Sequence, residues 1–417
     1  MNARGKIRVP GDKSISHRAL ILGAVASGES RISGILQSAD VHSTASVLRA
    51  LGVSVPDLSD SFRLVGKGLR GLRQPGTSLD AGNSGTTVRL MSGVVAAHPF
   101  AARFEGDASL SRRPMKRIAE PLTAMGARFE FARDDGLPMT VHGGRLSGIS
   151  WNTRAASAQT KSAILLAGLS AGVQVTVIEA QRSRDHTERM LTSLGAPVEV
   201  DDTSVSLSPV ESIAPLELAV PGDPSSAAYF VALAALGGSR EVELVNVCVN
   251  RTRTGFMDTM MEMGARIDYE DREAVAGDSS ATIVVRKSRL RDCVVSGARI
   301  PAMIDELPLL ACVAAAAGVT VEVRDAEELR VKESDRISTV ARNLRAVGVT
   351  VDEFQDGFAI RGQKKKLAGK VVTHGDHRIA MAFGVLGAIP GNAIEIDDPD
   401  CVQVSYPGFW QDLRSVG

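Results

Sequence analysis

Residues Pro121–Phe131 read PLTAMGARFEF, which predicts an amphipathic helix that ends at a glycine and is followed directly by a strand. The pattern returns as VLRALGVSV at Val47–Val55, MLTSLGAPVEV at Met190–Val200, MMEMGARIDY at Met260–Tyr269 and NLRAVGVTV at Asn343–Val351. Its glycines, with the one that closes FWQDLRSVG, are Gly52, Gly126, Gly195, Gly264, Gly348 and Gly417. Because these glycines are 69 to 84 residues apart, six repeats of about 70 residues account for the chain.

A second pattern alternates with the first. A polar residue precedes an apolar helix rich in small residues, and a glycine and a β-branched strand follow. The copies start at Asp12, Asn83, Ser157, Asp223, Asp305 and Asp376. Asp, Asn and Ser are preferred N-cap residues, and a helix that is apolar on all sides is buried. Each repeat is therefore predicted to contain one buried helix, one amphipathic helix and several strands, which indicates an α/β fold.

A domain boundary is predicted in the middle of the chain. The segment Pro209–Gly222 is rich in proline and separates the third repeat from the fourth. The tetrapeptide VPGD occurs at Val9–Asp12 and again at Val220–Asp223. This echo predicts two matching strand-to-helix crossings between domains of three repeats each.

The composition excludes several classes of protein. Lysine plus arginine and aspartate plus glutamate both total 48, and aromatic residues are only 4%. A general nucleic-acid binder would have a basic excess or stacking aromatics, so we expect no nucleic-acid partner. The basic residues are 37 arginines and 11 lysines, which reflects either codon usage or binding of carboxylate and phosphate groups.

The sequence favours a protein of the cytoplasm. Its four cysteines are far apart and form no CxxC pair, so neither a disulfide framework nor a zinc site is indicated. The first residues lack the apolar stretch of a signal peptide. Apolar stretches such as Ala163–Ala171 are shorter than the roughly 20 residues that span a bilayer, so we expect no membrane segment.

The predicted helix starts suggest a site for an anion. Helix N-termini carry partial positive charge and N–H donors without intrahelical partners. Several starts around one ligand would therefore bind an anion, whereas the alternative is that the polar residues only cap their helices. Four of the six starts carry Lys or Arg in the first two turns, which favours the anion site.

Candidate functional side chains gather at these starts and in nearby turns. They are Lys13, Ser14, His17, Arg18, Asn83, Gly85, Arg89, Arg112, Arg113, Ser157, Gln159, Lys161, Ser183, Arg184, Asp185, His186, Asp305, Glu306, Lys332, Glu333, Asp335, Arg336, His374, Asp376, His377 and Arg378. Asp305 opens a very apolar helix, either as a cap or as a base. HGDHR at 374–378 suggests either a metal or a cap followed by an anion-binding arginine, and no third ligand motif is evident. The set predicts a phosphorylated substrate and proton transfer without a metal.

Eight segments together closely resemble the 5-enolpyruvylshikimate-3-phosphate (EPSP) synthase family. In chain order they are GDKSISHRAL, GNSGTTVRL, SRRPM, SAQTKSA, VPGDPSSAAYF, the helix at Asp305, LRVKESDRI and GDHRIAMA. The resemblance implies a two-domain enolpyruvyl transferase fold, an inside-out α/β barrel of six βαβαββ repeats, three per domain, closing on a cleft. It implies an N-terminal domain of residues 12–219 and a C-terminal domain of residues 1–11 plus 220–417. The hinge would lie near residues 10–12 and 218–222.

The resemblance also implies an activity. The family transfers the carboxyvinyl group of phosphoenolpyruvate to the 5-hydroxyl of shikimate 3-phosphate and releases phosphate, by addition and elimination. It needs no cofactor and no metal. The implied partners are these two small substrates, with no nucleic acid and no membrane, and the implied state is a cytoplasmic monomer. The inhibitor glyphosate occupies the phosphoenolpyruvate site in this family.

The resemblance assigns the site residues motif by motif. Shikimate 3-phosphate would contact Lys13, Ser14, Arg18, Ser157, Gln159, Ser183, Arg184, Asp305 and Lys332. Phosphoenolpyruvate would contact Lys13, Asn83, Gly85, Arg113, Gln159, Arg336 and Arg378. The catalytic residues would be Lys13, Asp305, which accepts the 5-hydroxyl proton, and Glu333, which exchanges the proton at the methylene carbon.

The chain departs from the family at three positions, and two alternatives stay open. Ala158 replaces a second serine, His186 aligns with a tyrosine of some members, and Val404 aligns with a lysine. UDP-N-acetylglucosamine enolpyruvyl transferases resemble this fold but carry a reactive cysteine in the loop that matches Glu105–Met115, where this chain has none. An inactive phosphate-ligand-binding protein would be expected to lack Asp305 or Glu333.

Overall fold

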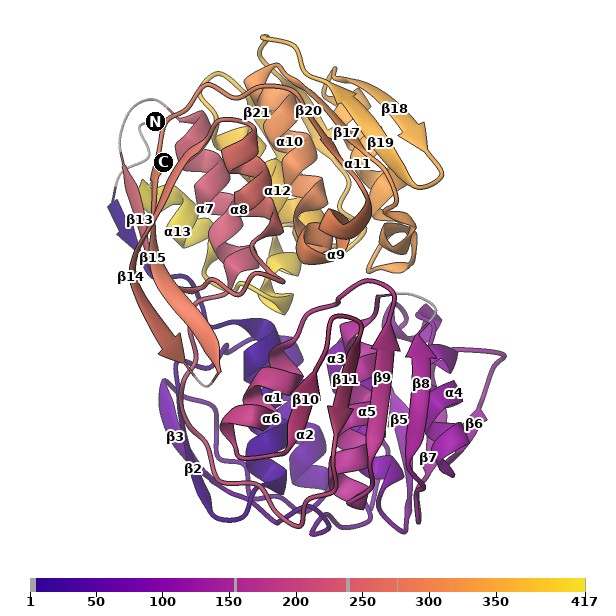
Figure 1. The fold of residues 1–417 in the computed structure, drawn as a ribbon. Helices are drawn as coiled ribbons and strands as arrows, with labels where there is room; N and C mark the ends of the chain where they lie inside the picture. The colour runs from indigo at the N-terminus through magenta and orange to yellow at the C-terminus, as the bar shows by residue number, and fades with distance from the viewer. Residues whose placement is uncertain (1–4, 154–155, 238–240, 276, 417) are drawn as a thin grey trace. The chain divides into compact units, whose positions relative to one another are not determined.

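The protein is described here by a computed structural model that covers residues 5–153, 156–237, 241–275 and 277–416. The chain divides into two compact units (Figure 1). Unit N comprises Gly11–Val220 and Ala274–Asp278, and unit C comprises Met1–Pro10, Pro221–Glu273 and Ser279–Gly417. A hinge where the chain passes between the units stays a prediction.

Unit N contains three sheets and six α-helices among its described residues. The sheets are, in strand order, β12 (Glu217–Ala219), β2 (Glu29–Ser33) and β3 (Ser61–Val65); β4 (Leu79–Asp80), β5 (Ala101–Glu105), β7 (Met139–His142) and β6 (Arg128–Phe131); and β10 (Val198–Val200), β11 (Ser204–Leu207), β9 (Val175–Glu179) and β8 (Ile149–Thr153). The helices are α1 (Lys13–Val25), α2 (Ala39–Ala50), α3 (Gly85–Ala96), α4 (Lys116–Met125), α5 (Ala158–Ala171) and α6 (His186–Ser193).

Unit C follows the same plan. Its sheets are β1 (Gly5–Ile7), β13 (Val242–Cys248), β15 (Asp278–Arg286) and β14 (Arg266–Val275); β16 (Cys293–Val295), β17 (Thr320–Val323), β19 (Gly357–Arg361) and β18 (Thr350–Phe354); and β20 (Ala368–Val371) with β21 (Ala393–Ile396). Its helices are α7 (Pro224–Leu236), α8 (Gly255–Glu262), α9 (Ile300–Met303), α10 (Leu307–Ala317), α11 (Arg336–Ala346), α12 (His377–Ala388) and α13 (Phe409–Val416).

The repeat predicted from the sequence is visible in strand pairing. In the second, third and fifth repeats a parallel pair is joined by the buried helix, and an antiparallel hairpin extends the sheet, as in β8–β9 followed by β10–β11. The sixth repeat is shorter, because β20 and β21 form a two-stranded parallel sheet and the chain then ends in α13. The six-repeat α/β prediction is therefore confirmed.

Two strands are exchanged between the first and fourth repeats. The first strand, β1, pairs in parallel with β13, which follows it by more than two hundred residues. The strand that ends the first half of the chain, β12, pairs in parallel with β2 near the chain start. Each of these two sheets is thus completed by a strand from the other half of the sequence.

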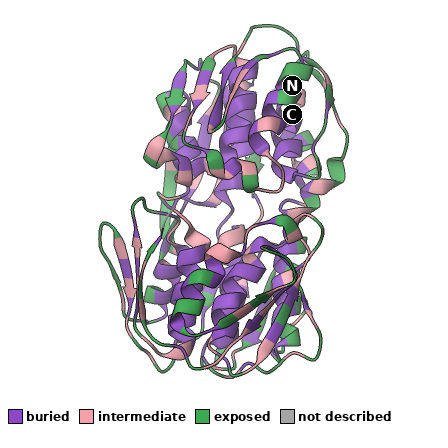
Figure 2. Ribbon diagram, turned by 90° about the vertical axis from the view of Figure 1, so that its right-hand side faces the viewer, coloured by how far each residue is buried: buried purple, intermediate pink, exposed green. Residues whose placement is uncertain are grey.

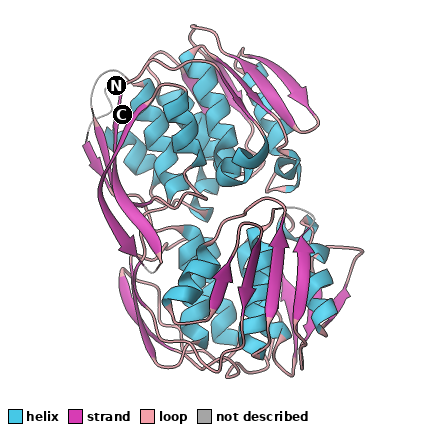
Figure 3. Ribbon diagram, in the orientation of Figure 1, coloured by secondary structure: helices cyan, strands magenta, loops and turns pink. Residues whose placement is uncertain are grey.

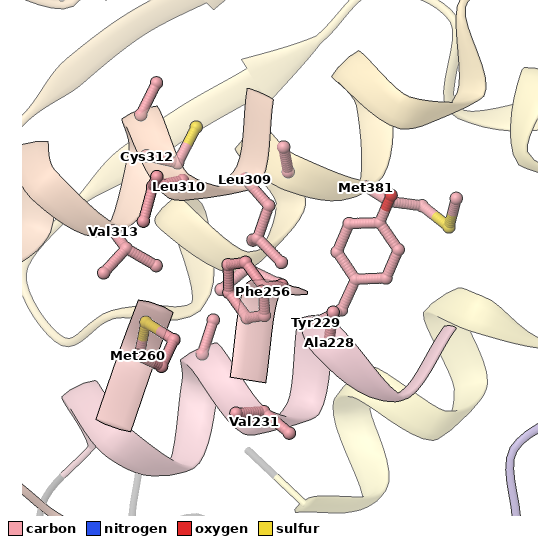
Figure 4. Close-up of a cluster of buried hydrophobic side chains, with 14 of the residues drawn as sticks. Ala228, Tyr229, Val231, Phe256, Met260, Leu309, Leu310, Cys312, Val313 and Met381 are labelled. Atoms are coloured by element: carbon pink, nitrogen blue, oxygen red, sulfur yellow. The ribbon is translucent and has the colours of Figure 1, made fainter. Parts of the chain in front are cut away.

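The apolar helices form the interior of each unit. Helices occupy the middle of a unit and sheets cover them from outside (Figure 3), and the buried residues follow the same division (Figure 2). In unit C, side chains of α7, α8, α10 and α12 interlock around Phe256 and Leu309 (Figure 4). In unit N, α3 and α5 approach so closely that a Cβ at Gly93 would lie 2.2 Å from the carbonyl oxygen of Ala163.

The repeat glycines have a conformational reason. Each one that the structure describes, from Gly52 to Gly348, has a φ between 81° and 119°, a region that only glycine enters without steric cost. Gly417 lies outside the described residues. The expected strand after Gly52 is wrong, because Val53–Val55 is irregular and the strand of that repeat is β3.

Two expected helix caps and one expected helix length also differ. Ser84, not Asn83, caps α3, and Asp305 caps no helix because it lies in a helical turn between α9 and α10. This turn joins both helices into one run, Gly297–Ala317, which is long and apolar enough to cross a membrane by length and composition. Of the most apolar stretch of this run, 67% is buried inside the protein, as in a core helix.

Candidate active site

The start of α1 presents Lys13 beside a buried carboxylate. Asp12 caps the helix, and its side chain accepts from the backbone N–H of Ile15 at 2.8 Å. Lys13 is the first helical residue, and its ammonium group forms an ion pair with Asp40 at the start of α2. Asp40 was missed by sequence reasoning, because no motif connects it with Lys13.

Arg18 joins the starts of α1, α5 and α6. Its Nε donates to the hydroxyl of Thr187 at 2.7 Å, Nη2 to the hydroxyl of Ser162 at 2.7 Å, and Nη1 to the carbonyl of Ser14 at 2.9 Å. Only 4% of Arg18 is exposed. Because the guanidinium is planar, these bonds fix its orientation. Ser162 and Thr187 were also missed, although both lie within or beside quoted motifs.

Ser183 is held by a buried charge cluster, which we call the Lys161 cluster (Lys161, Glu179, Ser183 and Glu188). The Lys161 ammonium lies 2.7 Å from a carboxylate oxygen of Glu179 and 2.7 Å from one of Glu188. The Ser183 hydroxyl donates to Glu179 at 2.5 Å. Burial alone would lower the pKa of Lys161, but the two carboxylates outweigh it and raise this pKa. Since one cation serves two carboxylates, burial still raises the pKa of Glu188.

His17 is a buried, neutral hydrogen-bonding residue. Burial, with Lys13 and Arg18 nearby, lowers its pKa well below 6.5. Its Nδ1 lies 2.7 Å from the Thr44 hydroxyl, which lies 2.6 Å from the hydroxyl of Thr87 on α3. This relay links α1, α2 and α3. These contacts support a hydrogen-bonded packing role for His17 rather than that of a general base.

The starts of α3 and α5 are joined through Arg89, in what we call the Arg89 cluster (Gly85, Thr86, Arg89, Pro114 and Gln159). Nη1 of Arg89 donates to Oε1 of Gln159 at 2.7 Å, and Nη2 donates to the carbonyl of Pro114 at 3.3 Å. The Gln159 amide nitrogen donates to the hydroxyl of Thr86 at 3.1 Å. Gly85 is the first residue of α3 and is buried.

Arg113 lies against the same helix start. Its Nη2 donates to Oδ1 of Asn83 at 2.6 Å and to the hydroxyl of Ser109 at 3.3 Å. The Asn83 amide nitrogen in turn donates to Asp107 at 2.6 Å. Two of the predicted residues, Asn83 and Arg113, are therefore brought together, with Arg113 largely buried.

In unit C one arginine gathers three carboxylates, which we call the Arg336 cluster (Asp305, Glu333, Arg336 and Asp376). Nε and Nη2 of Arg336 donate to the two oxygens of Asp376 at 2.8 and 3.2 Å. Nη1 donates to Asp305 at 3.1 Å, and Nη2 also donates to Glu333 at 2.7 Å. The two predicted proton-transfer groups, Asp305 and Glu333, therefore accept hydrogen bonds from the same guanidinium.

The other predicted cations of unit C lie beside this cluster. The Lys332 ammonium is 3.7 Å from Asp305, and burial lowers the pKa of Lys332 although Asp305 raises it in part. Arg378 is hydrogen-bonded to the hydroxyl of Tyr229, whose pKa burial raises to about 12. Nη1 of Arg378 is also 4.0 Å from a carboxylate oxygen of Glu306.

These contacts bear on the cap roles of Asp305 and of Asp376 in HGDHR. Asp305 is bound by two cations rather than by helix N–H groups, so its role as a cap is wrong. Asp376 caps α12 through the backbone N–H of Arg378 at 2.9 Å and is also bound by Arg336. Among residues 5–153, 156–237, 241–275 and 277–416, no group of His, Cys, Asp and Glu is arranged to hold a metal ion.

The remaining predicted residues lie near these groups or apart from them. Ser157 caps α5 and accepts from Thr160. Arg184 is half-buried in the loop before α6. His186 bonds Asp278 at 2.7 Å, both fully buried. Val404 ends a 3₁₀ turn at Pro399–Val404.

The six repeats, three of sheet-covered helices in each half of the chain, define the fold of the enolpyruvyl transferases. A solved enolpyruvyl transferase, NikO from Streptomyces tendae, superposes with a TM-score of 0.73 at 16% identity and covers 100% of this chain and 95% of that one. This likeness concerns the fold alone.

The sequence comparisons are more specific. The family model described as EPSP synthase (3-phosphoshikimate 1-carboxyvinyltransferase) matches residues 1–413, and the chain belongs to this family. Relatives named 3-phosphoshikimate 1-carboxyvinyltransferase, from Sulfurihydrogenibium and Aquifex aeolicus, are 45% and 46% identical, each over 99% of this chain and 97% of the relative. A solved EPSP synthase from Acinetobacter baumannii is 38% identical, with a TM-score of 0.88, over 100% of this chain and 96% of that one. The protein transfers the enolpyruvyl group of phosphoenolpyruvate to shikimate 3-phosphate.

Proposed function

We propose that the predicted residues divide between the two substrates as the family motifs indicate. Shikimate 3-phosphate is bound by Lys13, Ser14, Arg18, Ser157, Gln159, Ser183, Arg184, Asp305 and Lys332. Phosphoenolpyruvate is bound by Lys13, Asn83, Gly85, Arg113, Gln159, Arg336 and Arg378. Because the assigned residues belong to both units, we expect neither unit alone to bind both substrates, and we place the hinge near residues 10–12 and 218–222.

The observation that carries the proposal is the Arg336 cluster. Asp305 and Glu333 both bond Arg336, at 3.1 and 2.7 Å. A molecule held by this guanidinium is therefore within reach of both carboxylates. Four of the five N–H groups of Arg336 serve the three carboxylates. In this proposal the second N–H of Nη1 donates to a carboxylate or phosphate oxygen of the substrate.

Asp305 acts as the base in this proposal. Arg336 and Lys332, at 3.1 and 3.7 Å, stabilise its ionised form. The carboxylate accepts the proton of the 5-hydroxyl as that oxygen attacks the central carbon of phosphoenolpyruvate. Protonated Glu333 supplies a proton to the methylene carbon, which becomes a methyl group and gives a tetrahedral intermediate.

Elimination reverses the proton transfer at Glu333. The Glu333 carboxylate removes a proton from the methyl group, the carbon–carbon double bond forms again, and the carbon–oxygen bond to phosphate breaks. Phosphate leaves with the bonding electron pair, and the proton held by Asp305 passes to phosphate or water. Lys13, Arg113 and Arg378 stabilise the negative charge that collects on phosphate and carboxylate oxygens in both steps.

The remaining assignments concern the setting of the reaction. We propose a cytoplasmic monomer whose partners are its two substrates, without nucleic acid, membrane, cofactor or metal. The balanced charge of the chain, with 48 basic and 48 acidic residues, supports the absence of a polyanionic partner.

Phosphate release by the purified protein tests the proposal. We expect release with phosphoenolpyruvate and shikimate 3-phosphate and none with UDP-N-acetylglucosamine as acceptor. Asp305→Asn should lower kcat by roughly 10²- to 10⁴-fold, the usual contribution of a positioned base, while shikimate 3-phosphate still binds. Glu333→Gln should also slow the incorporation of solvent deuterium into phosphoenolpyruvate.

A matched control uses a carboxylate of the same unit. Asp352 forms an exposed ion pair with Arg361 at 2.8 Å, so Asp352→Asn should leave kcat unchanged. Near-normal turnover by Asp305→Asn would show that another group accepts the proton. Turnover with UDP-N-acetylglucosamine would show that the protein uses the alternative acceptor.

A further inference from the structure

Arg89 is a buried arginine to which neither substrate is assigned. Only 6% of its surface is exposed. Its two terminal nitrogens bond Gln159 at 2.7 Å and the carbonyl of Pro114 at 3.3 Å. It therefore connects α3, on which it lies, with α5 and with the turn that carries Arg113.

The orientation of the Gln159 amide depends on Arg89. Arginine has donors and no acceptor, so the amide oxygen of Gln159 must face it. The amide nitrogen then faces the hydroxyl of Thr86 at 3.1 Å. Among the residues that the structure describes, loss of the Arg89 bond would leave only the longer contact with Thr86, at 3.1 Å, to hold the amide.

Residue 85 lies directly against the same guanidinium. A Cβ built on Gly85 would be 2.9 Å from Nη1 of Arg89, the atom that bonds Gln159, and 3.5 Å from Cδ1 of Leu110. Ordinary contacts of this kind are about 3.5 Å or longer, so Nη1 would have to move by roughly half an ångström. The Gln159 and Pro114 bonds oppose that movement.

We propose that Arg89 is a positioning residue through which the size of residue 85 acts on Gln159. The proposal rests on the proposed function, in which Gly85 and Gln159 belong to the phosphoenolpyruvate site. An alanine at position 85 then has two effects: its methyl group takes space from the ligand, and it displaces the guanidinium that orients Gln159. The second effect reaches every ligand that uses Gln159.

A double-mutant cycle with Arg89→Lys and Gln159→Ala tests the positioning role. Lysine keeps the charge but loses the planar fork, so we expect the KM for phosphoenolpyruvate to rise on the order of tenfold and kcat to change much less. In the Gln159→Ala background, Arg89→Lys should change KM by less than about twofold, because the amide it positions is gone. Fully additive changes in KM would overturn the proposal.

A second cycle connects residue 85. Gly85→Ala should raise the KM for phosphoenolpyruvate less in the Arg89→Lys background than in the wild type, because lysine has no atom at the position of Nη1. A crystal structure of Gly85→Ala supplies an independent measurement that needs no arginine variant. A distance from Nη1 to Gln159 Oε1 that stays at 2.7 Å in that variant would contradict the proposal.

The controls separate this proposal from the proposed function. Arg49 also lies in unit N and donates to backbone carbonyls, at 2.7 Å to Val55 and 2.6 Å to Pro56, so Arg49→Lys should leave the KM unchanged. If Gln159→Ala and Arg113→Ala both leave the KM for phosphoenolpyruvate unchanged, the assigned site is wrong. If both raise it and the cycles are additive, only the role of Arg89 is wrong.

Discussion

Removal of Lys161 should destabilise unit N strongly. Lys161 is 1% exposed and is the cation that Glu179 and Glu188 share at 2.7 Å each. Lys161→Met would leave two buried carboxylates without their cation, and breaking a buried pair in this way costs about 3–5 kcal/mol. For a unit of about 200 residues, 1 kcal/mol moves Tm by roughly 2–4 °C, so we expect a decrease of about 6–20 °C.

Calorimetry of the unit N transition measures this decrease in Tm. Two further variants test whether the loss of the buried cation causes it. Lys116→Met removes an exposed ion pair with Asp134, which is worth less than about 1 kcal/mol, and should lower Tm by a few degrees at most. Combining Lys161→Met with Glu179→Gln and Glu188→Gln should recover most of the loss, because no uncompensated carboxylate remains. A Lys161→Met protein that melts within about 3 °C of the wild type would refute the reasoning.

The pH dependence of this difference has a definite sign. The pKa of Lys161 is raised above 10.5 in the folded protein. Its contribution is therefore complete below pH 10.5 and is lost as the pH rises through the raised value. The Tm difference between wild type and Lys161→Met should stay constant from neutral pH to pH 10 and shrink above that range.

Three further outcomes are expected. Burial lowers the pKa of Lys332 below 10.5, so the ammonium group loses its positive charge at a lower pH than an exposed lysine does. The KM for shikimate 3-phosphate should therefore rise with pH below 10.5, and Lys332→Arg should abolish that rise. Because the pKa of His17 lies well below 6.5, its contribution to stability is present above pH 6.5 and lost as the pH falls; between pH 7.5 and 5 the wild type should lose more Tm than His17→Asn, and equal losses would contradict this. Glyphosate should inhibit competitively with phosphoenolpyruvate, and Gly85→Ala should weaken it by about 1–3 kcal/mol, roughly 5- to 150-fold; inhibition assays at fixed shikimate 3-phosphate measure both, and a wild type that is already insensitive would mean that another residue sets the size of this pocket.

Much of the fold could be predicted because its signals are local. The repeat glycines report a backbone conformation, and the caps Asp12, Ser157 and Asp223 lie next to the helices that they cap. The predicted cap at Asp305 is wrong because the preceding residues, Ile300–Met303, are already helical, so no helix begins at its carboxylate. A helix boundary of this kind is set by packing rather than by the residue at the start.

The charge pairing of the site could not be predicted. The sequence indicates a strongly cationic site, but Lys13 is paired with Asp40 and Arg336 with Asp376, 27 and 40 residues away along the chain. No periodicity connects such partners, because the distance between them is fixed by how the helices pack. The motifs therefore identify which cations are present, while the structure shows how they are neutralised.

The exchange of β1 and β12 has a consequence for how the chain folds as it is synthesised. The sheet of β2 and β3 is not complete until residues 217–219 have left the ribosome, although β2 ends at Ser33. Gly5–Ile7, made first, must wait for Val242–Cys248 before it finds its parallel partner. A nascent chain of about 200 residues would thus carry one unpaired sheet edge and one unpaired strand, both of which are prone to wrong pairing. A chain that starts at Gly11 would lack β1, and the edge of β13 that β1 covers would then be open in every molecule.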